Sequence, residues 1–251
     1  MSFFCAIFWI CSFIAWNIQN SGTIEFNNPQ KENIANILSE VEKIKADVVV
    51  FQEFQLEYGS ELVENGLKRM DYECTVCTDE QDKTLRNRVL IAVKSKYLFD
   101  DCEYPPKIRK YSRRNWREIF IKNKNIVILG VDVPLAETSA SDGRKRDNRK
   151  EKKEFLEAMK VKFEEYSKYN IPAMVIGDFN LHEYAVFKEY LSIFDDLLTN
   201  VTTKEPTWGK YKLDYIYVNS EMKKLIHKSK AFSPYETVYS DHKYLYVDIE
   251  D

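Results

Sequence analysis

Five short polar motifs lie within or at the ends of apolar segments of this 251-residue sequence, and their side chains are of types that take part in hydrolysis. Strand ends are where functional side chains gather in sheet proteins, because the strand interior supplies rigidity. Five such motifs are much harder to attribute to chance than one. The motifs are Asn17, Glu53, Gly177-Asp178-Phe179-Asn180, Asp214 within Leu213-Asp214-Tyr215-Ile216, and Ser240-Asp241-His242.

Carboxylate and amide oxygens dominate these motifs, whereas the whole sequence holds three histidines. Oxygen donors indicate a hard cation, Mg²⁺ or Mn²⁺, rather than zinc. Mg²⁺ commonly takes one or two protein carboxylates and leaves positions for a substrate phosphate, so Glu53 and one later aspartate would suffice. A cation held there stabilises charge on phosphoryl oxygens and lowers the pKa of a water. The motifs therefore predict metal-assisted hydrolysis of a phosphoester.

Each motif also has a simpler structural interpretation. Asn17 fits a strand-end cap, Glu53 fits a solvated surface residue, and Gly177-Asp178-Phe179-Asn180 fits an ordinary turn. Asp214 is harder to explain in this way, because a buried carboxylate in an apolar strand needs a partner. The functional interpretation therefore depends on the five motifs taken together. His182 and His227 are expected at the surface or behind the site.

Strands and helices alternate along the chain. β-branched and aromatic residues predict strands, and apolar stripes at helical spacing predict helices. Such mixing without a linker predicts either two packed sheets with helices outside or a layered α/β domain, and periodicity does not separate the two. The expected strands are Ser12 to Ile18, Val48 to Phe51, Val89 to Val93, Glu118 to Ile121, Ile126 to Val131, Ala173 to Ile176, Leu213 to Val218 and Tyr244 to Ile249, and the expected helices are Lys31 to Ile44, Arg149 to Tyr166 and Glu183 to Tyr190.

The composition is that of an ordinary globular protein, with 44% hydrophobic and 31% charged residues. The formal net charge of -3 gives no global attraction to a polyanion, so nucleic-acid binding must use local patches or a metal. Glu137 to Asn148 is the one candidate linker. We expect a mobile basic loop there, because apolar patterning resumes at Phe155. Residues 1–251 are therefore predicted to form a single domain.

Two features bear on the compartment. The five cysteines form an odd set in a chain too large to need disulfides, which favours a reducing, cytoplasmic environment. Cys74 and Cys77 lack a second metal-binding pair and are interpreted as incidental strand cysteines. The apolar run from Phe3 to Trp16 is shorter than a spanning helix and lacks a basic flank, so membrane association is not expected and a membrane-tethered state is the alternative.

The five motifs, in this order, resemble the motif set of the endonuclease/exonuclease/phosphatase family, and they extend from near the start of the chain to within ten residues of its end. The resemblance implies a four-layer α/β sandwich, in which two central, mostly antiparallel sheets are flanked by helices. It also implies that Glu53 is the principal metal ligand, assisted by Asn17 and Asp241. By the same resemblance Asp178 orients or deprotonates the attacking water, and Asn180 holds that water or a phosphate oxygen.

The resemblance further implies that His242 contacts the scissile phosphate while Asp214 fixes its tautomer. A carboxylate partner also raises a histidine pKa and so favours a cation beside phosphate. One position departs from the family. Asp132 stands where many members carry histidine or tyrosine, and an ionised aspartate cannot donate a hydrogen bond to phosphate. Asp132 is interpreted as an additional metal ligand, with a protonated side chain or weakened catalysis as alternatives.

Two basic segments bear on the substrate. Basic side chains interleaved with aromatic ones suit single-stranded or distorted nucleic acid, although a solvated charged face would look the same. Together the segments favour a nuclease over a phosphatase or phosphodiesterase acting on an inositol or lipid phosphoester. A catalytically weakened scaffold of the same fold is a further alternative, and neither a stable protein partner nor an oligomeric state is inferred. The segments are Lys107 to Arg117 and Arg144 to Arg149.

Overall fold

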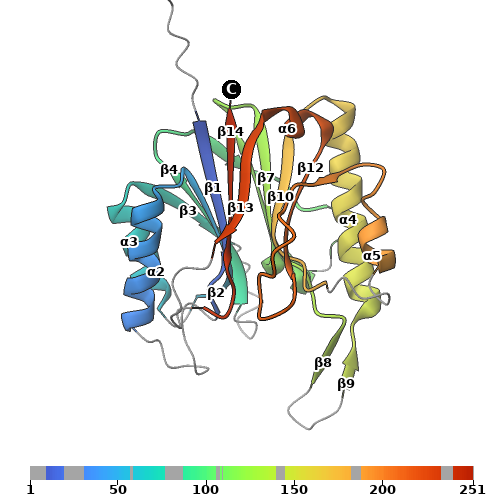
Figure 1. Ribbon diagram of the computed structural model, residues 1–251, viewed down its shortest axis with the longest axis horizontal. Helices are drawn as coiled ribbons and strands as arrows, with labels where there is room; N and C mark the ends of the chain where they lie inside the picture. The colour runs from blue at the N-terminus through green and yellow to red at the C-terminus, as the bar shows by residue number, and fades with distance from the viewer. Residues whose placement is uncertain are drawn as a thin grey trace, which may run out of the picture.

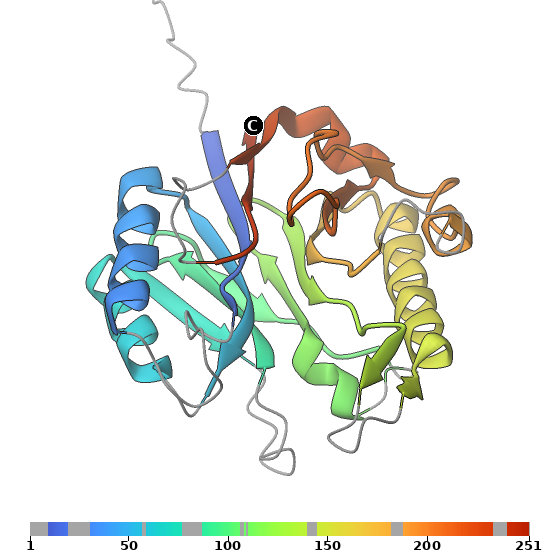
Figure 2. The same cartoon turned by 60° about the horizontal axis from the view of Figure 1, so that its bottom comes forward.

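Two six-stranded sheets pack face to face, with helices on their outer faces (Figures 1 and 2). The computed structural model describes residues 10–19, 31–56, 59–76, 87–105, 108, 110–139, 145–181, 188–232 and 240–250. The sandwich implied by the family resemblance is confirmed.

The first sheet has the strand order β13-β14-β1-β2-β4-β3. β1 and β2 are parallel, and the other neighbouring strands are antiparallel. The parallel pair sends the ends of β1 and β2 to the same edge of the sheet. The strands are β1 (Ile10–Asn17), β2 (Val48–Gln55), β3 (Tyr72–Val76), β4 (Asn87–Lys94), β13 (Ile226–Phe232) and β14 (Tyr244–Glu250).

The second sheet has the order β11-β12-β10-β7-β6-β5, and its one parallel pair is β10 with β7. The carboxyl ends of β7 and β10 therefore also meet at one edge, where the antiparallel β12 begins. The strands are β5 (Phe99–Asp101), β6 (Trp116–Ile121), β7 (Ile126–Asp132), β10 (Ala173–Asp178), β11 (Thr199–Asn200) and β12 (Asp214–Val218).

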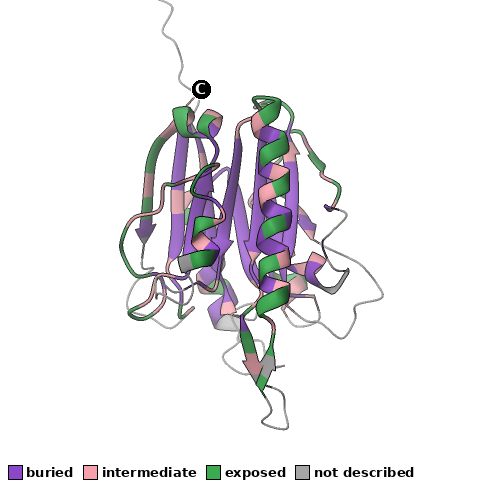
Figure 3. Ribbon diagram, turned by 90° about the vertical axis from the view of Figure 1, so that its right-hand side faces the viewer, coloured by how far each residue is buried: buried purple, intermediate pink, exposed green. Residues whose placement is uncertain are grey.

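Three apolar layers hold the sandwich together, because the central strands are buried on both faces. Along β1, Phe13 and Ala15 belong to the layer between the sheets, whereas Ile14 and Trp16 belong to the layer under the helices of the first sheet. This alternation follows from the two-residue period of a strand. A strand buried on both faces needs apolar residues at successive positions, which explains the continuous apolar runs in the sequence. Figure 3 shows the buried strands behind the exposed outer face of one helix.

Helices cover the outer faces of both sheets (Figure 1). The expected helix over Lys31–Ile44 is confirmed, and the long helix expected from Arg149 extends two residues beyond Tyr166. Of the helix expected over Glu183 to Tyr190, residues 183–187 lie outside the described residues and residues 188–190 belong to a short helix. The helices are α2 (Lys31–Ile44), α3 (Ser60–Arg69), the 3-10 helix η2 (Lys110–Asn115), α4 (Arg149–Lys168), α5 (Lys188–Ser192) and α6 (Ser220–Leu225).

A mobile basic loop was expected over Glu137 to Asn148, and the expectation of a loop was wrong for the described part, which contains two strands. β8 (Glu137–Ser139) and β9 (Lys145–Asp147) form an antiparallel ribbon, which projects beyond the lower end of the sandwich in Figure 1. A Lys145–Glu137 ion pair of 3.6 Å and a hydrogen bond from Asn148 Nδ2 to Thr138 Oγ1 of 3.0 Å join its two sides. Cross-strand pairs of this kind stabilise a ribbon that lacks an apolar core.

The apolar N-terminal run supplies part of the core. Its described residues form β1, which pairs with β14 on one side and β2 on the other. The buried strand expected at Ser12 to Ile18 is thus confirmed, apart from a shift of one or two residues at its ends. Residues 1–9 lie outside the described residues. Among the helices of the described ranges, none is long and apolar enough to cross a membrane.

Candidate active site

Strand register brings three aspartates into one row at the edge of the second sheet. Asp178, the last residue of β10, is paired with Asp132 at the end of β7 on one side. On the other side Asp178 is paired with Asp214 at the start of β12. Neighbouring strands lie roughly 5 Å apart, so this register alone concentrates three carboxyl groups. The sequence pointed to each residue separately, and the pairing places all three in one site.

Asn17 joins the two sheets at this edge. Its side-chain Nδ2 donates to Glu53 Oε1 at 3.2 Å and to Asp178 Oδ2 at 3.1 Å. Its Oδ1 accepts a hydrogen bond from the backbone N–H of Gln19 at 3.0 Å. In this arrangement Asn17 orients two carboxylates, and its amide oxygen faces its own chain. To act as the expected metal ligand, the side-chain amide of Asn17 must rotate so that Oδ1 leaves the Gln19 N–H and faces the site.

A β-bulge sets the direction of the Glu53 side chain. The pairing of β2 with β4 shifts register between Phe51 and Phe54, and Glu53 has a φ of 55°. A left-handed conformation is rare for a residue with a long side chain and is found where the surrounding structure enforces it. Bulges next to functional sites redirect one side chain out of the strand alternation. Here the redirected carboxylate is the one that meets Asn17.

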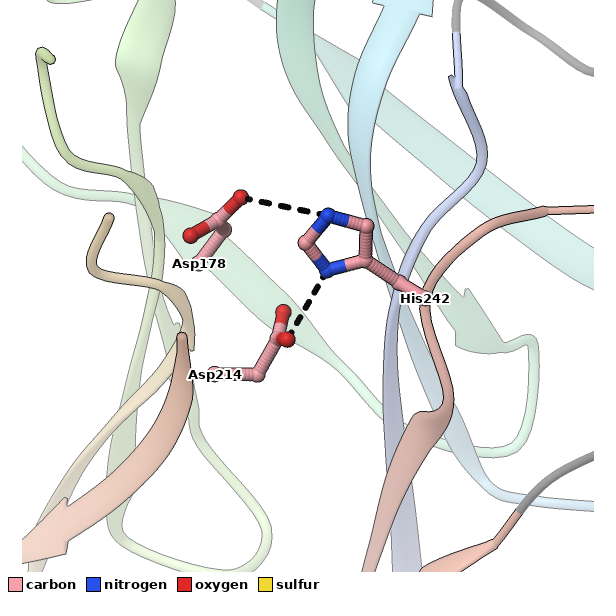
Figure 4. A group of neighbouring side chains, drawn as sticks. All are labelled: Asp178, Asp214 and His242. Atoms are coloured by element: carbon pink, nitrogen blue, oxygen red, sulfur yellow. Dashed lines mark hydrogen bonds and ion pairs between the residues drawn. The ribbon is translucent and has the colours of Figure 1, made fainter. Parts of the chain in front are cut away.

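His242 lies between two of the aspartates (Figure 4). Its Nδ1 is 2.9 Å from Asp214 Oδ2, which is hydrogen-bonding distance. Its Nε2 is 3.9 Å from Asp178 Oδ2, too long for a hydrogen bond. Burial alone lowers the pKa of His242, but the charge and hydrogen bond of Asp214 outweigh burial and raise the pKa to about 10. The ring is therefore a cation at neutral pH, and its Nε2–H is directed toward the site.

The carboxyl group of Asp178 is held at both oxygens. Oδ1 accepts the backbone N–H of Asn180 at 2.7 Å, and Oδ2 accepts Nδ2 of Asn17 at 3.1 Å. Burial, followed by the negative charge of Asp214, raises the pKa of Asp178 to about 7. A carboxyl group with this pKa is suited to accept a proton near neutral pH.

The turn after β10 places Asn180 beside Asp132. Asn180 has a φ of 50°, and its Nδ2 donates to Asp132 Oδ1 at 3.3 Å and to the Val133 carbonyl at 2.9 Å. Burial, then the charges of Asp178 and Glu53, raise the pKa of the Asp132 carboxyl well above its usual range. Asp132 thus belongs to the same electrostatic cluster as Glu53 and Asp178.

The donor set fits a hard divalent cation. Glu53, Asp132 and Asp178 supply carboxyl oxygens. Burial and the charges of Asp178 and Glu53 disfavour ionisation of Asp132, and burial and the charge of Asp214 disfavour ionisation of Asp178. A cation among them would offset that repulsion, and carboxylate oxygens are the ligands that Mg²⁺ prefers. Ligand atoms of Asp178, Asp214 and His242 also lie within 4.8 Å of one another. We interpret that second group as a hydrogen-bonded histidine–aspartate pair, because the 2.9 Å contact occupies Nδ1.

Asp241 lies at the exposed rim. Its Oδ2 accepts a hydrogen bond from the indole Nε1 of Trp208 at 2.7 Å. The backbone beside it is tied to the first sheet, because the Ser240 hydroxyl donates to the carbonyl of Asn17. This bond brings Asp241, the residue after Ser240, close to Asn17, while the Asp241 carboxylate accepts the hydrogen bond from Trp208.

Part of the basic surface expected to bind nucleic acid is engaged within the protein. Arg117 pairs with Asp101 and donates to Thr75, and the guanidinium of Arg113 lies 5.2 Å from the centre of the Tyr104 ring. In the second segment Arg149 pairs with Asp147 at 2.8 Å. Lys107, Arg109 and Arg144 lie outside the described residues, as does His182.

Three further residues support the site, and two of them, Asn115 and Lys152, were not singled out in the sequence. The buried Thr207 hydroxyl accepts the backbone N–H groups of Leu213 and Asp214 at 3.0 and 3.1 Å, which fixes the start of β12. Asn115 Nδ2 donates to the Asp132 carbonyl at 2.6 Å. Lys152 is buried and donates to the Asn180 carbonyl at 2.7 Å. Its position three and four residues before Phe155 and Leu156, on their apolar stripe, was a usable signal.

Two packed mixed sheets with an acidic, histidine-containing site at one edge define a DNase I-like α/β sandwich. A model of the Endonuclease/Exonuclease/phosphatase family matches residues 14–242, and the chain belongs to that family. A search of curated protein sequences found no match.

Solved structures share the fold at low sequence identity. The 3' phosphatase NExo from Neisseria, bound to a product DNA hairpin, matches with a TM-score of 0.72 and 13% identity, over 95% of this chain and 99% of that one. An AP endonuclease from Archaeoglobus fulgidus matches with a TM-score of 0.71 and 14% identity, over 94% and 98%. The human Nocturnin catalytic domain matches with a TM-score of 0.59 and 16% identity, over 95% and 93%.

Proposed function

We propose that this protein is a Mg²⁺- or Mn²⁺-dependent phosphodiester hydrolase and that its substrate is a nucleic acid. The observation that carries the proposal is the placement of His242 between Asp214 and Asp178. The contact between Nδ1 and Asp214 makes the imidazole a stable cation. The 3.9 Å distance from Nε2 to Asp178 Oδ2 leaves the Nε2–H available to a phosphate oxygen.

Asp178 is suited to act as the general base. Both of its oxygens are oriented by hydrogen bonds, and its pKa of about 7 matches proton abstraction from water near neutral pH. His242 stabilises the negative charge that develops on the phosphoryl group, since its charged form persists to about pH 10. Asn180 positions the water or a phosphate oxygen through its side-chain amide, which already lies against Asp132.

Glu53 is the proposed principal metal ligand, with Asn17, Asp241 and Asp132 as further candidates. The bulge that redirects Glu53 and the electrostatic cluster it forms with Asp132 support this set. Bound Mg²⁺ would stabilise negative charge on the phosphoryl oxygens. The side chains of Asn17 and Asp241 must leave Gln19 and Trp208 to serve as ligands.

Two observations support a nucleic-acid substrate. The exposed side chain of Lys145, which pairs with Glu137 at 3.6 Å, belongs to the β8–β9 ribbon, and Figure 1 shows this ribbon beyond the lower end of the sandwich. Of the similar structures, one is a phosphatase bound to a DNA hairpin and another is named an AP endonuclease. Phosphate contacts from basic side chains provide sequence-independent affinity for such substrates.

A substrate panel tests the proposal. Plasmid, single-stranded DNA, RNA, inositol phosphates and sphingomyelin are incubated with the protein in Mg²⁺, in Mn²⁺ and in EDTA. We expect cleavage of a nucleic acid that EDTA abolishes and that falls at least about 100-fold in Glu53→Gln, since a lost metal ligand removes several kcal/mol of charge stabilisation. Cleavage that persists in EDTA contradicts the metal role. Turnover confined to an inositol or lipid phosphoester contradicts the nucleic-acid substrate.

A further inference from the structure

Lys152 is a charged residue in an apolar setting. Lys152 lies in the first turn of α4 and is 0% exposed. The helix neighbours on its stripe, Phe155 and Leu156, pack in the apolar layer beneath the second sheet. Burying an ammonium group costs several kcal/mol unless hydrogen bonds and opposite charges compensate. The groups that compensate the buried Lys152 ammonium therefore indicate its role in the structure.

The partners of Lys152 belong to the active-site edge. Its Nζ donates to the Asn180 carbonyl at 2.7 Å. Burial lowers the pKa of Lys152 to about 8, while the charges of Asp178 and Asp132 act in the opposite direction. The ammonium thus interacts with the charges of both aspartates, and it reaches the Asn180 carbonyl from α4.

Asn180 has a left-handed backbone conformation and is contacted at several of its polar groups. Its backbone N–H bonds to Asp178, and its side-chain amide bonds to Asp132 and Val133. The bond from Lys152 holds its carbonyl, so N–H, side chain and carbonyl each have a partner. A φ of 50° lies in the left-handed region, which Asn adopts more readily than most residues other than glycine. Releasing the carbonyl would let the turn relax and move the side-chain amide.

We propose that Lys152 is a positioning residue for hydrolysis, which holds Asn180 in place through its carbonyl and sets the Asn180 amide against Asp132. The proposal rests on the proposed function for its kinetic consequence. It goes beyond that function because it assigns Lys152 a role through the Asn180 carbonyl rather than through substrate or metal. Lys152 and Asp132 contact the same residue, because Lys152 bonds to the Asn180 carbonyl and Asp132 accepts from the Asn180 side-chain amide.

A purely structural role would be to anchor the start of α4 under the sheet. An apolar side chain of similar length would serve that role at least as well, because replacing a buried charge by a hydrophobic residue is often neutral or stabilising. The two roles therefore predict different outcomes for methionine at this position. Anchoring predicts a stable and active variant, whereas positioning predicts a stable variant with slow turnover.

The kinetic test compares Lys152→Met, Lys152→Arg and the control Lys153→Met. Lys153 is the next residue on the same helix and is exposed. We expect kcat of Lys152→Met to fall about 10- to 100-fold with KM within about twofold of wild type, a pattern typical of lost transition-state positioning. Lys152→Arg keeps the charge and the donor, and it should recover at least half of the lost activity on a logarithmic scale. Lys153→Met should match wild type.

Two kinetic outcomes overturn the proposal. One is a kcat for Lys152→Met within about twofold of the Lys153→Met value. The other is a Lys152→Arg variant that melts like wild type and yet is as slow as Lys152→Met. If Lys152→Met does not fold, Lys152→Leu, which also lacks a hydrogen-bond donor, takes its place with the same expectations.

A second measurement needs no turnover. The hydrogen exchange of the Asn180 backbone amide is followed by NMR in EDTA for wild type, Lys152→Met and Lys153→Met. We expect exchange at least about tenfold faster in Lys152→Met and unchanged in Lys153→Met, and an unchanged rate in Lys152→Met overturns the proposal. If the wild-type protein hydrolyses nothing in the panel, the proposed function has failed, while this experiment still decides whether Lys152 holds Asn180.

Discussion

The His242–Asp214 pair makes a prediction that needs neither substrate nor metal. Asp214→Asn replaces the carboxylate by a neutral amide of the same shape, while burial of the ring stays the same. Both side chains are almost fully buried, at 6% and 3% exposure. Without Asp214, burial lowers the pKa of His242 while the charges of Asp178 and Asp241 still raise it, so we expect that pKa to fall from about 10 toward its ordinary value of about 6.5.

The cost to stability follows from the same pair. Breaking a buried ion pair by removing one partner costs roughly 3–5 kcal/mol. We expect the lower end, about 3 kcal/mol, because His242 can shed its proton. A raised histidine pKa contributes stability that is fully present below about pH 6.5 and is lost as the pH rises through about 10. The gap between wild type and Asp214→Asn should therefore be widest near pH 6.5 and narrow toward pH 10.

Two assays measure these quantities on the metal-free protein. NMR follows the imidazole C–H resonances, and with three histidines in the chain the His242 signal can be assigned by single substitutions. Denaturant unfolding between pH 6 and 10 measures the stability gap. The control is Glu250→Gln, because Glu250 pairs with His227 at 3.0 Å in an exposed setting. An exposed pair contributes less than about 1 kcal/mol. A wild-type His242 that titrates near pH 6.5 would refute the reasoning.

Three further predictions concern the base, the turn and the basic surface. Asp178→Asn should lower kcat at least about 100-fold. The wild-type rate should rise with pH along an acid limb at or below about pH 7, because Asp178 must lose its proton and a bound cation shifts its pKa downward. A rate independent of pH between 5 and 8 would contradict this. Gly177→Ala should lower the free energy of unfolding by about 3 kcal/mol, because Gly177 has a φ of 145° and an added Cβ would collide with the Val131 carbonyl. In thermal melts Gly209→Ala is the matched control, since a Cβ there meets nothing within 4 Å, and equal losses for the two would refute the steric reasoning. Arg117→Met should destabilise the fold by roughly 1–3 kcal/mol yet leave nucleic-acid affinity and its salt dependence unchanged, because Arg117 is engaged with Asp101 and Thr75. Filter-binding titrations at several salt concentrations measure that affinity. A weaker salt dependence in the variant would place Arg117 at the nucleic acid.

Much of the fold could be predicted from local patterns. The apolar stripe of Lys31–Ile44 predicted the helix to the residue, since the pattern and the burial agree there. β13 was not predicted, because its sequence, Ile-His-Lys-Ser-Lys-Ala-Phe, has polar residues on an edge strand that only β14 covers. The β8–β9 ribbon was missed for a similar reason, since charged cross-strand pairs rather than apolar residues stabilise it.

For the site, the residue types and their order along the chain were enough to indicate the family, whose model matches residues 14–242, while the hard cation remains a prediction. These are properties of chemistry and spacing that need no coordinates. The individual metal and catalytic roles assigned from the sequence remain predictions.

Only the tertiary structure decided how these groups act on one another. Strand register set Asp132 beside Asp178, the bulge redirected Glu53, and the path of α4 buried Lys152 behind Asn180. It also turned the amide of Asn17 toward two carboxylates and engaged Arg117 within the protein. Electrostatic interactions and hydrogen bonds depend on distances of a few ångströms between residues far apart in the chain, and those distances exist once the two sheets have packed.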